Sequence, residues 1–129
     1  MSAEVHRLKS VATKQVKTQW RRIVTGIPAP GSIADIESLR SVEPISMQGM
    51  PPIFWKEAQG FLVRDGFGNQ WIDFSSGIVA ANVGHSHPKI MQAIHKAVDD
   101  KLLFSYVFPA ETRKKLLSKI VSLSPIREP

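Results

Sequence analysis

The first 25 residues carry apolar side chains at the spacing of one helical face. These residues recur at steps of three and four, and they are Val5, Leu8, Ala12, Val16, Trp20 and Ile23. In a helix of 3.6 residues per turn such positions form one stripe, and the polar residues between them form the opposite face. The pattern therefore predicts an amphipathic helical arm over residues 1–25.

Proline interrupts the pattern in residues 26–52. Five of the nine prolines and three of the eight glycines fall in this stretch, so neither a long helix nor a regular strand can form there. Within it, Ser32 is suited to begin a short helix through Ile36 and Leu39, with Asp35 close to the positive end of the helix dipole. We expect a connecting segment that contains one short helix.

From residue 53 onward, aromatic and β-branched residues gather in three short runs. The runs lie at residues 53–55, 61–63 and 71–74, and they are separated at Gly60 and by the turn sequence DGFGN at residues 65–69. Short runs of this composition with turn residues between them are typical of β-hairpins. The sequence predicts a small antiparallel β-meander.

Small residues dominate the next stretch, and two helical patterns follow it. Residues 75–84 are small or apolar and are flanked by glycine, which suits a backbone that passes close to another group. Pro88 and Pro109 each stand where a helix can begin, and Pro125 stands where the second helix must end. Apolar residues at helical spacing follow each start.

Together these elements predict the α+β class, with an N-terminal helix, a connecting segment, a small antiparallel β-meander and then two helices. We expect three parts along the chain: the arm at 1–25, the connecting segment at 26–52 and the remainder at 53–129. A chain of 129 residues is long enough to bury one core but not two.

Composition excludes several classes of protein. The chain has no cysteine, so disulfide frameworks, thiolate zinc sites and cysteine nucleophiles are ruled out. No apolar run approaches the roughly 18 residues that span a bilayer, and no signal-peptide core follows Met1. We expect a soluble, cytoplasmic protein, and a mitochondrial presequence in residues 1–25 is the alternative.

The positive charge is concentrated in one place. Of the net charge of +6, residues 1–25 contribute +5, because six cations and one acid fall there. Such an arm could bind a membrane surface, contact phosphates, or pack its apolar stripe on protein while the lysines face water. No aromatic-rich strand, zinc finger or recognition-helix pattern accompanies the charge, so we do not expect a nucleic-acid partner.

Residues that could carry chemistry do not form a complete catalytic set. His85 and His87 are the only close histidine pair, and with Asp73 or His95 they could be considered for a metal site, but the matched ligand spacing of zinc sites is missing. We expect one histidine to cap the following helix and the other to bond to the backbone. The glycine-rich stretches match neither a dinucleotide fingerprint nor a phosphate-binding P-loop, and no serine stands in a nucleophile elbow.

The stretch at residues 61–88, FLVRDGFGNQWIDFSSGIVAANVGHSHP, resembles the N-terminal signature of class III aminotransferases. These are fold-type I, pyridoxal-phosphate enzymes that include acetylornithine, ornithine and 4-aminobutyrate aminotransferases. Residues 89–103 resemble the family's first long helix, and residues 104–125 resemble the segment that leads into the large cofactor domain. Residues 1–50 are covered only loosely.

The resemblance implies a function for the parent protein and a limited role for these residues. The parent would transfer an amino group from an amino acid or ω-amino acid to a 2-oxo acid, as a homodimer that uses pyridoxal 5'-phosphate. Residues 53–129 would be the N-terminal part of its small domain and the lead-in to the large domain.

In the family, the phosphate loop and the imine-forming lysine come later than the position matched by Pro129. The resemblance therefore implies a fragment that is inactive alone, binds no cofactor alone, and supplies no catalytic, cofactor-binding or metal-binding residue. What it would supply is one wall of the substrate site, formed by Ser76, Gly77, Ile78, Tyr106 and Phe108. Ordinary core packing is the alternative role for Ile78 and Phe108.

A second hypothesis stays open beside this one. The chain could be a catalytically inert interaction module that keeps the small-domain fold and binds a partner through its basic arm.

Overall fold

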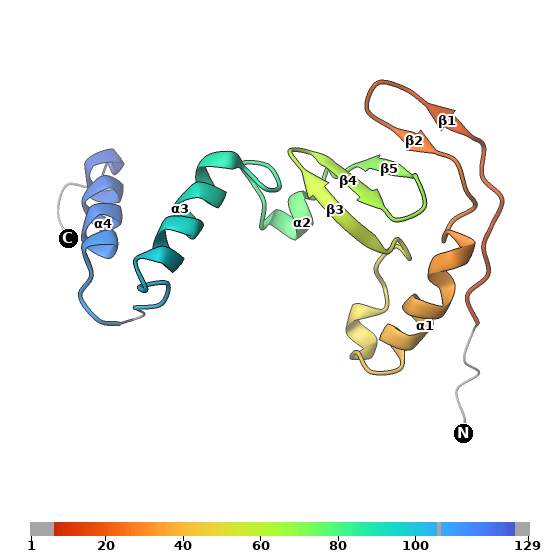
Figure 1. The fold of residues 1–129 in the computed structure, drawn as a ribbon, viewed down its shortest axis with the longest axis horizontal. Helices are drawn as coiled ribbons and strands as arrows, with labels where there is room; N and C mark the ends of the chain where they lie inside the picture. The colour runs from red at the N-terminus through yellow and green to blue at the C-terminus, as the bar shows by residue number, and fades with distance from the viewer. Residues whose placement is uncertain (1–6, 106, 126–129) are drawn as a thin grey trace. The chain divides into compact units, whose positions relative to one another are not determined.

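The computed structural model describes residues 7–105 and 107–125 and divides the chain into two compact units, Met1–His87 and Pro88–Pro129. Strands and short helices make up the first unit, and two longer helices make up the second (Figure 1). The α+β class is therefore confirmed. No helix in the described ranges is long and apolar enough to cross a membrane.

One antiparallel sheet organises the first unit. Its strands lie in the order β1-β2-β5-β4-β3, and their bounds are Val16–Lys17 for β1, Arg22–Ile23 for β2, Trp55–Gln59 for β3, Leu62–Asp65 for β4 and Gln70–Ile72 for β5. Strands β3, β4 and β5 form the predicted meander (Figure 1). Gly60 makes the first turn with a φ of 58°, a left-handed conformation that glycine adopts without steric cost. A bulge between Trp55 and Glu57 interrupts the outer pairing.

The predicted N-terminal helix is wrong for the part of the arm that the structure describes. Residues 7–25 contain no helix, and strands β1 and β2 form a hairpin there instead, joined by a turn in which the Arg21 N–H bonds to the Thr18 hydroxyl at 2.9 Å. The segment is rich in valine, isoleucine and threonine, whose branched side chains favour strands over helices. Strand β2 also pairs with strand β5, through Arg22 and Gln70. Hydrogen bonding to a strand far along the chain therefore favours a strand here, although the apolar residues have the spacing of a helix.

A buried amide holds this hairpin to the meander. Asn69 is 2% exposed, and its Oδ1 accepts hydrogen bonds from the N–H groups of Val24 at 2.8 Å and Thr25 at 3.2 Å. Its Nδ2 donates to the Thr25 hydroxyl and to the Asp65 carboxylate, both at 2.7 Å. Every hydrogen-bonding site of the amide is therefore occupied, which is what makes its burial tolerable.

The connecting segment contains the expected short helix. A 3₁₀ turn at Pro30–Ser32 leads into α1, Ile33–Arg40, and a second 3₁₀ turn follows at Ile45–Met47. The Ser32 hydroxyl donates back to the Ala29 carbonyl at 2.8 Å and does not cap the helix. Among the described residues the buried apolar side chains are few: Ile23, Pro28, Ala29, Ile36 and Val63.

The second unit contains the two predicted helices. They are α3, Pro88–Asp99, and α4, Glu111–Leu123, so α3 begins at the expected proline and α4 ends before Pro125. Neither helix buries a residue, and the apolar side chains of both are exposed, for example Ile94 by 44% and Ile120 by 54%. Each helix therefore presents an uncovered apolar stripe.

Candidate functional site

A left-handed turn follows strand β5 at the segment that the sequence marks as unusual. This turn is the short helix α2, Ser76–Val79. Its φ angles are 52° at Ser76, 60° at Gly77, 60° at Ile78 and 56° at Val79. The left-handed conformation costs about 1–2 kcal/mol for each residue that is not glycine, and it is rarest for β-branched residues. Such a turn persists only where surrounding contacts hold it.

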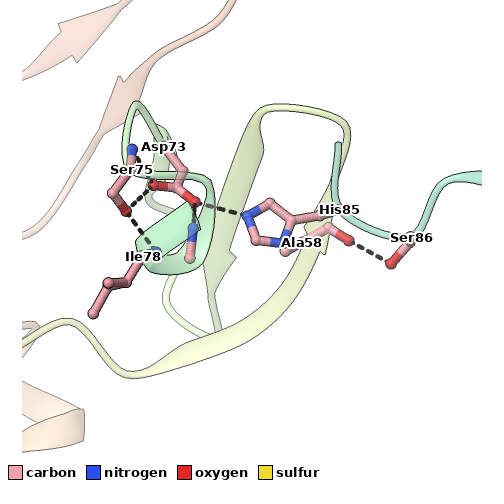
Figure 2. Close-up of polar contacts among 7 residues, drawn as sticks. Ala58, Asp73, Ser75, Ile78, His85 and Ser86 are labelled. Carbon is pink, nitrogen blue, oxygen red and sulfur yellow. Dashed lines mark hydrogen bonds and ion pairs between the residues drawn. The ribbon is translucent and has the colours of Figure 1, made fainter. Parts of the chain in front are cut away.

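The carboxylate of Asp73 supplies several of those contacts. Its Oδ1 accepts hydrogen bonds from the Ser75 N–H at 2.9 Å and the Ser75 hydroxyl at 2.6 Å (Figure 2). Its Oδ2 accepts from the Gly77 N–H at 2.8 Å and from the His85 ring at 2.7 Å. The Asp73 side chain is only 6% exposed.

These donors keep the carboxylate charged. The Ser75 hydroxyl first, and then the His85 ring, hold the pKa of the Asp73 carboxyl well below its usual range, against the opposing effect of burial. An ionised carboxylate only accepts hydrogen bonds, so the Nε2 atom of His85 carries the proton between them.

His85 links the turn to the sheet. Its backbone N–H and carbonyl pair with those of Gly60, at 2.7 and 2.8 Å, and its ring meets Trp55 edge-on with centroids 5.6 Å apart. Gly84 lies beside this pairing with a φ of 96°, and a Cβ at that position would lie 3.2 Å from the Gly60 Cα. The chain can approach this closely only because residue 84 is glycine.

The expected roles of the two histidines need correction. His85 was expected to cap a helix or bond to the backbone through its ring, but its ring instead bonds to Asp73. The Nδ1 atom of His87 is buried and has no hydrogen-bond partner among the described residues. Within the same ranges, no group of three or more His, Asp or Glu side chains is arranged to hold a metal ion.

A cavity of about 640 Å³ opens beside the turn. One part of its wall is formed by Asp73, Ser75, Gly77 and Ile78. The rest of its wall is mostly apolar and consists of Leu39, Met50, Pro51, Ile53, Phe54, Trp55, Val63, Trp71 and Ile72. Among the described residues, no lysine, arginine or histidine lines it. The polar side chains that a ligand would meet there are Ser75 and Asp73, which are hydrogen-bonded to each other.

Two of the five predicted site residues line the larger cavity. Gly77 and Ile78 line the larger cavity, whereas Ser76 lines a smaller one of about 310 Å³ that His85 also borders. Ile78 is 64% exposed, so it does not pack in the core of the first unit. Phe108 belongs to the second unit and is 72% exposed, and Tyr106 lies outside the described residues.

Sequence reasoning did not find the roles of Asp73 and His85. Asp73 was considered only as a metal ligand, although an aspartate two residues before a serine and four before a glycine has the spacing of a local side-chain cap. The signal for His85 was weaker, since its bond to Asp73 depends on the pairing of its backbone with Gly60 across the fold.

A comparison with known protein families identifies the family of this chain. The model of class III aminotransferases matches residues 45–128, which include the meander, the left-handed turn and both helices of the second unit. The chain belongs to the class III aminotransferase family.

Curated relatives agree with this assignment. The chain is 41% identical over 73 residues to ornithine aminotransferase 2 of Staphylococcus saprophyticus, a match that covers 57% of the chain and 18% of the relative. It is 35% identical over 80 residues to acetylornithine aminotransferase of Methanocaldococcus jannaschii, covering 62% and 20%. It is 34% identical over 82 residues to 4-aminobutyrate aminotransferase of Mycobacterium leprae, covering 64% and 18%. The chain thus spans about a fifth of the length of the curated relatives it matches.

The family uses pyridoxal 5'-phosphate, but the residues around the turn do not fit this cofactor. Neither cavity beside the turn is lined by a lysine that could form an imine. The carboxylate of Asp73 already accepts from Ser75, Gly77 and His85, so it is not available for a pyridinium nitrogen. No step of the reaction is therefore assigned to a cofactor at this turn.

Proposed function

We propose that this chain is the N-terminal part of a pyridoxal-phosphate-dependent aminotransferase, in which it supplies one wall of the substrate site. The proposal is supported by the position and the conformation of one segment. The segment that the family resemblance assigns to the substrate wall, Ser76 to Ile78, adopts a strained left-handed turn at the edge of a cavity. Strain of this kind concentrates at functional sites.

The wall would contact the apolar part of the substrate. Ile78, Gly77 and the neighbouring aromatic side chains offer no charge to bind a substrate carboxylate or amino group. Residues outside this chain would bind those charged ends, carry the phosphate loop and provide the imine lysine. The parent would move an amino group from an amino acid or ω-amino acid to a 2-oxo acid, as a cytoplasmic homodimer. Tyr106 and Phe108 would complete the wall of the substrate site.

A chimera tests the proposal directly. Residues 45–128 would replace the matching segment of the Staphylococcus saprophyticus relative, and amino transfer would be followed through the absorbance of the cofactor. We expect an active chimera in which Ile78→Ala raises KM for the amino donor, because the substrate loses apolar contact. The matched control is Ile45→Ala, since Ile45 is 86% exposed and lines none of the cavities described.

The outcomes of this experiment are distinct. A chimera that folds, binds cofactor and transfers amino groups, but whose kcat and KM do not respond to Ile78→Ala or Ile78→Trp, would contradict the role of the wall. For the chain alone, we expect no single lysine to be labelled stoichiometrically by pyridoxal phosphate and borohydride. One stoichiometric adduct would contradict the proposal that the cofactor is held by residues outside this chain.

A second candidate function is a catalytically inert interaction module. It is favoured by the basic hairpin, where Lys17 and Arg22 lie directly opposite each other on β1 and β2 although like charges repel. In the described part of the chain, neither residue forms an ion pair. A stable, monodisperse monomer that does not combine with any aminotransferase cofactor domain would favour the module over the enzyme part.

A further inference from the structure

The left-handed turn needs an external constraint. Ile78 and Val79 are β-branched and have φ angles of 60° and 56°, which their side chains disfavour. Apolar packing does not supply the constraint, since the two side chains are 64% and 75% exposed. The contacts that remain are hydrogen bonds. Some are backbone bonds of the turn itself, from the Val79 N–H to the Ser75 carbonyl and from the Ala81 N–H to the Ser76 carbonyl, both 2.8 Å long. The side-chain bonds that tie the turn to the rest of the first unit pass through one carboxylate, that of Asp73.

Asp73 cannot serve as a ligand for anything else. Its two oxygens accept four hydrogen bonds, from the Ser75 N–H, the Ser75 hydroxyl, the Gly77 N–H and the His85 ring. A carboxylate offers about four acceptor sites, so its capacity is full. The geometry therefore argues against direct contact with a substrate and in favour of a role exerted through the turn.

His85 determines where that carboxylate lies. Its ring donates to Asp73, while its backbone is paired on both sides with Gly60 at the β3–β4 turn. The ring also packs edge-on against Trp55 of β3. His85 thus connects the carboxylate, and with it the turn, to strand β3 and the β3–β4 turn. Figure 2 shows the bond between the His85 ring and Asp73.

We propose that Asp73 and His85 are positioning residues, whose carboxylate–imidazole pair holds Ser76–Val79 left-handed so that Ile78 stands at the cavity edge in advance of any substrate. That Ile78 faces a substrate rests on the proposed function, whereas the action of the pair on the turn does not. Without the pair, the turn relaxes toward right-handed backbone angles and Ile78 leaves the cavity edge.

The backbone angles can be measured by nuclear magnetic resonance on the labelled 129-residue chain. A positive φ brings the amide and α protons of one residue close together and gives a strong cross-peak between them. We expect strong cross-peaks for Ile78 and Val79 in the wild type. His85→Phe keeps the ring packing on Trp55 but removes the donor, and the Ile78 cross-peak should fall to the intensity found for residues with negative φ.

Rescue and control variants separate this role from a general effect on folding. His85→Gln restores an N–H donor and should restore the Ile78 cross-peak. Ser86→Ala removes the adjacent hydrogen bond to the Ala58 carbonyl, 2.9 Å long, and should leave the cross-peak unchanged. The proposal is overturned if His85→Phe keeps the cross-peak, or if His85→Gln loses it as His85→Phe does.

A glycine background covers the case in which His85→Phe unfolds the first unit. Glycine adopts a φ of 60° without steric cost, so the shift in unfolding midpoint caused by His85→Phe should shrink when Ile78→Gly is present. An equal shift in both backgrounds would overturn the proposal. In the chimera, His85→Phe should raise KM as Ile78→Ala does, and His85→Gln should reverse the increase. An inactive chimera would count against the proposed function and leave the result for the turn unchanged.

Discussion

Asn69→Ala should detach the N-terminal hairpin from the meander and lower the stability of the first unit. The substitution removes four side-chain hydrogen bonds, two accepted from the backbone of Val24 and Thr25 and two donated to Thr25 and Asp65. Each such bond contributes about 1 kcal/mol net, so the sum is about 4 kcal/mol. Water that reaches the freed N–H groups would reduce the loss to about 2 kcal/mol.

Urea unfolding followed by tryptophan fluorescence measures this loss. Trp20, Trp55 and Trp71 are the three tryptophans of the chain and all lie in the first unit, so the signal reports that unit alone. Amide exchange at Val24 and Thr25 should accelerate in the same variant, because both N–H groups lose their acceptor.

An exposed asparagine provides the matched control. Asn82 is exposed and makes no side-chain hydrogen bond within the described ranges, so Asn82→Ala should change the unfolding free energy by less than about 0.5 kcal/mol. If Asn69→Ala costs less than about 1 kcal/mol, or no more than Asn82→Ala does, the buried amide is not what joins the hairpin to the sheet.

Three further predictions follow from single contacts. The pKa of the Asp73 carboxyl is lower in the folded chain than in the unfolded chain, where it is about 3.9. The ionised carboxylate therefore contributes fully to the free energy of unfolding above about pH 4, and this contribution is lost as the pH falls toward the lower pKa of the folded chain. Below about pH 4 the unfolding free energy should therefore fall by up to about 1.4 kcal/mol per pH unit from this group, and urea unfolding at several pH values should show a shallower slope for Asp73→Asn. Gly84→Ala should lower the thermal midpoint, because a side chain there is strained at a φ of 96° and approaches Gly60, whereas Gly49→Ala, with no atom within 4 Å, should leave the midpoint unchanged. The apolar stripe of α4 is uncovered, so we expect copies of the isolated chain to associate through it. Ile120→Lys, at a residue that is 54% exposed on α4, should reduce this association in sedimentation velocity without loss of helicity, and undiminished association would show that the copies associate through another surface.

Local patterns were sufficient to predict the meander and the helices of the second unit. Gly60 and the DGFGN turn mark where the strands end, and Pro88 and Pro109 stand where helices can start. The first run was placed too early, at residues 53–55, because β3 is Trp55–Gln59 and its Lys56 and Glu57 do not favour a strand by composition. These elements depend on neighbours in sequence, so the sequence contains their signal.

The N-terminal hairpin depends on distant residues and was therefore predicted wrongly. Val16 and Ile23 satisfy helical spacing, but they also face each other across β1 and β2. The hairpin is favoured over the helix because β2 pairs with β5 and Val24 bonds to Asn69, and these partners lie more than 40 positions further along the chain. No periodicity within residues 1–25 contains that information.

The conformation of the candidate site could not be predicted from the sequence. The family resemblance points to Ser76, Gly77 and Ile78, yet only Gly77 suggests a positive φ from its residue type. For Ile78 and Val79, propensity favours an extended strand, so the residue types do not indicate their left-handed angles. The bond of Asp73 to Gly77 is local, whereas its bond to His85 depends on a contact twelve residues away that no local pattern reveals.

The side chains of Asn69 and Asp73 stabilise the first unit in the same way. Few apolar side chains are buried among the described residues, namely Ile23, Pro28, Ala29, Ile36 and Val63, so packing alone fixes little of the first unit. Asn69 and Asp73 instead join distant segments through hydrogen bonds in which every acceptor and donor of the side chain is occupied. Such bonds are directional, so they fix geometry even where apolar surfaces lie open. The turn at Ile78 can therefore keep its left-handed shape although the Ile78 side chain is 64% exposed and the cavity beside it is lined mostly by apolar side chains.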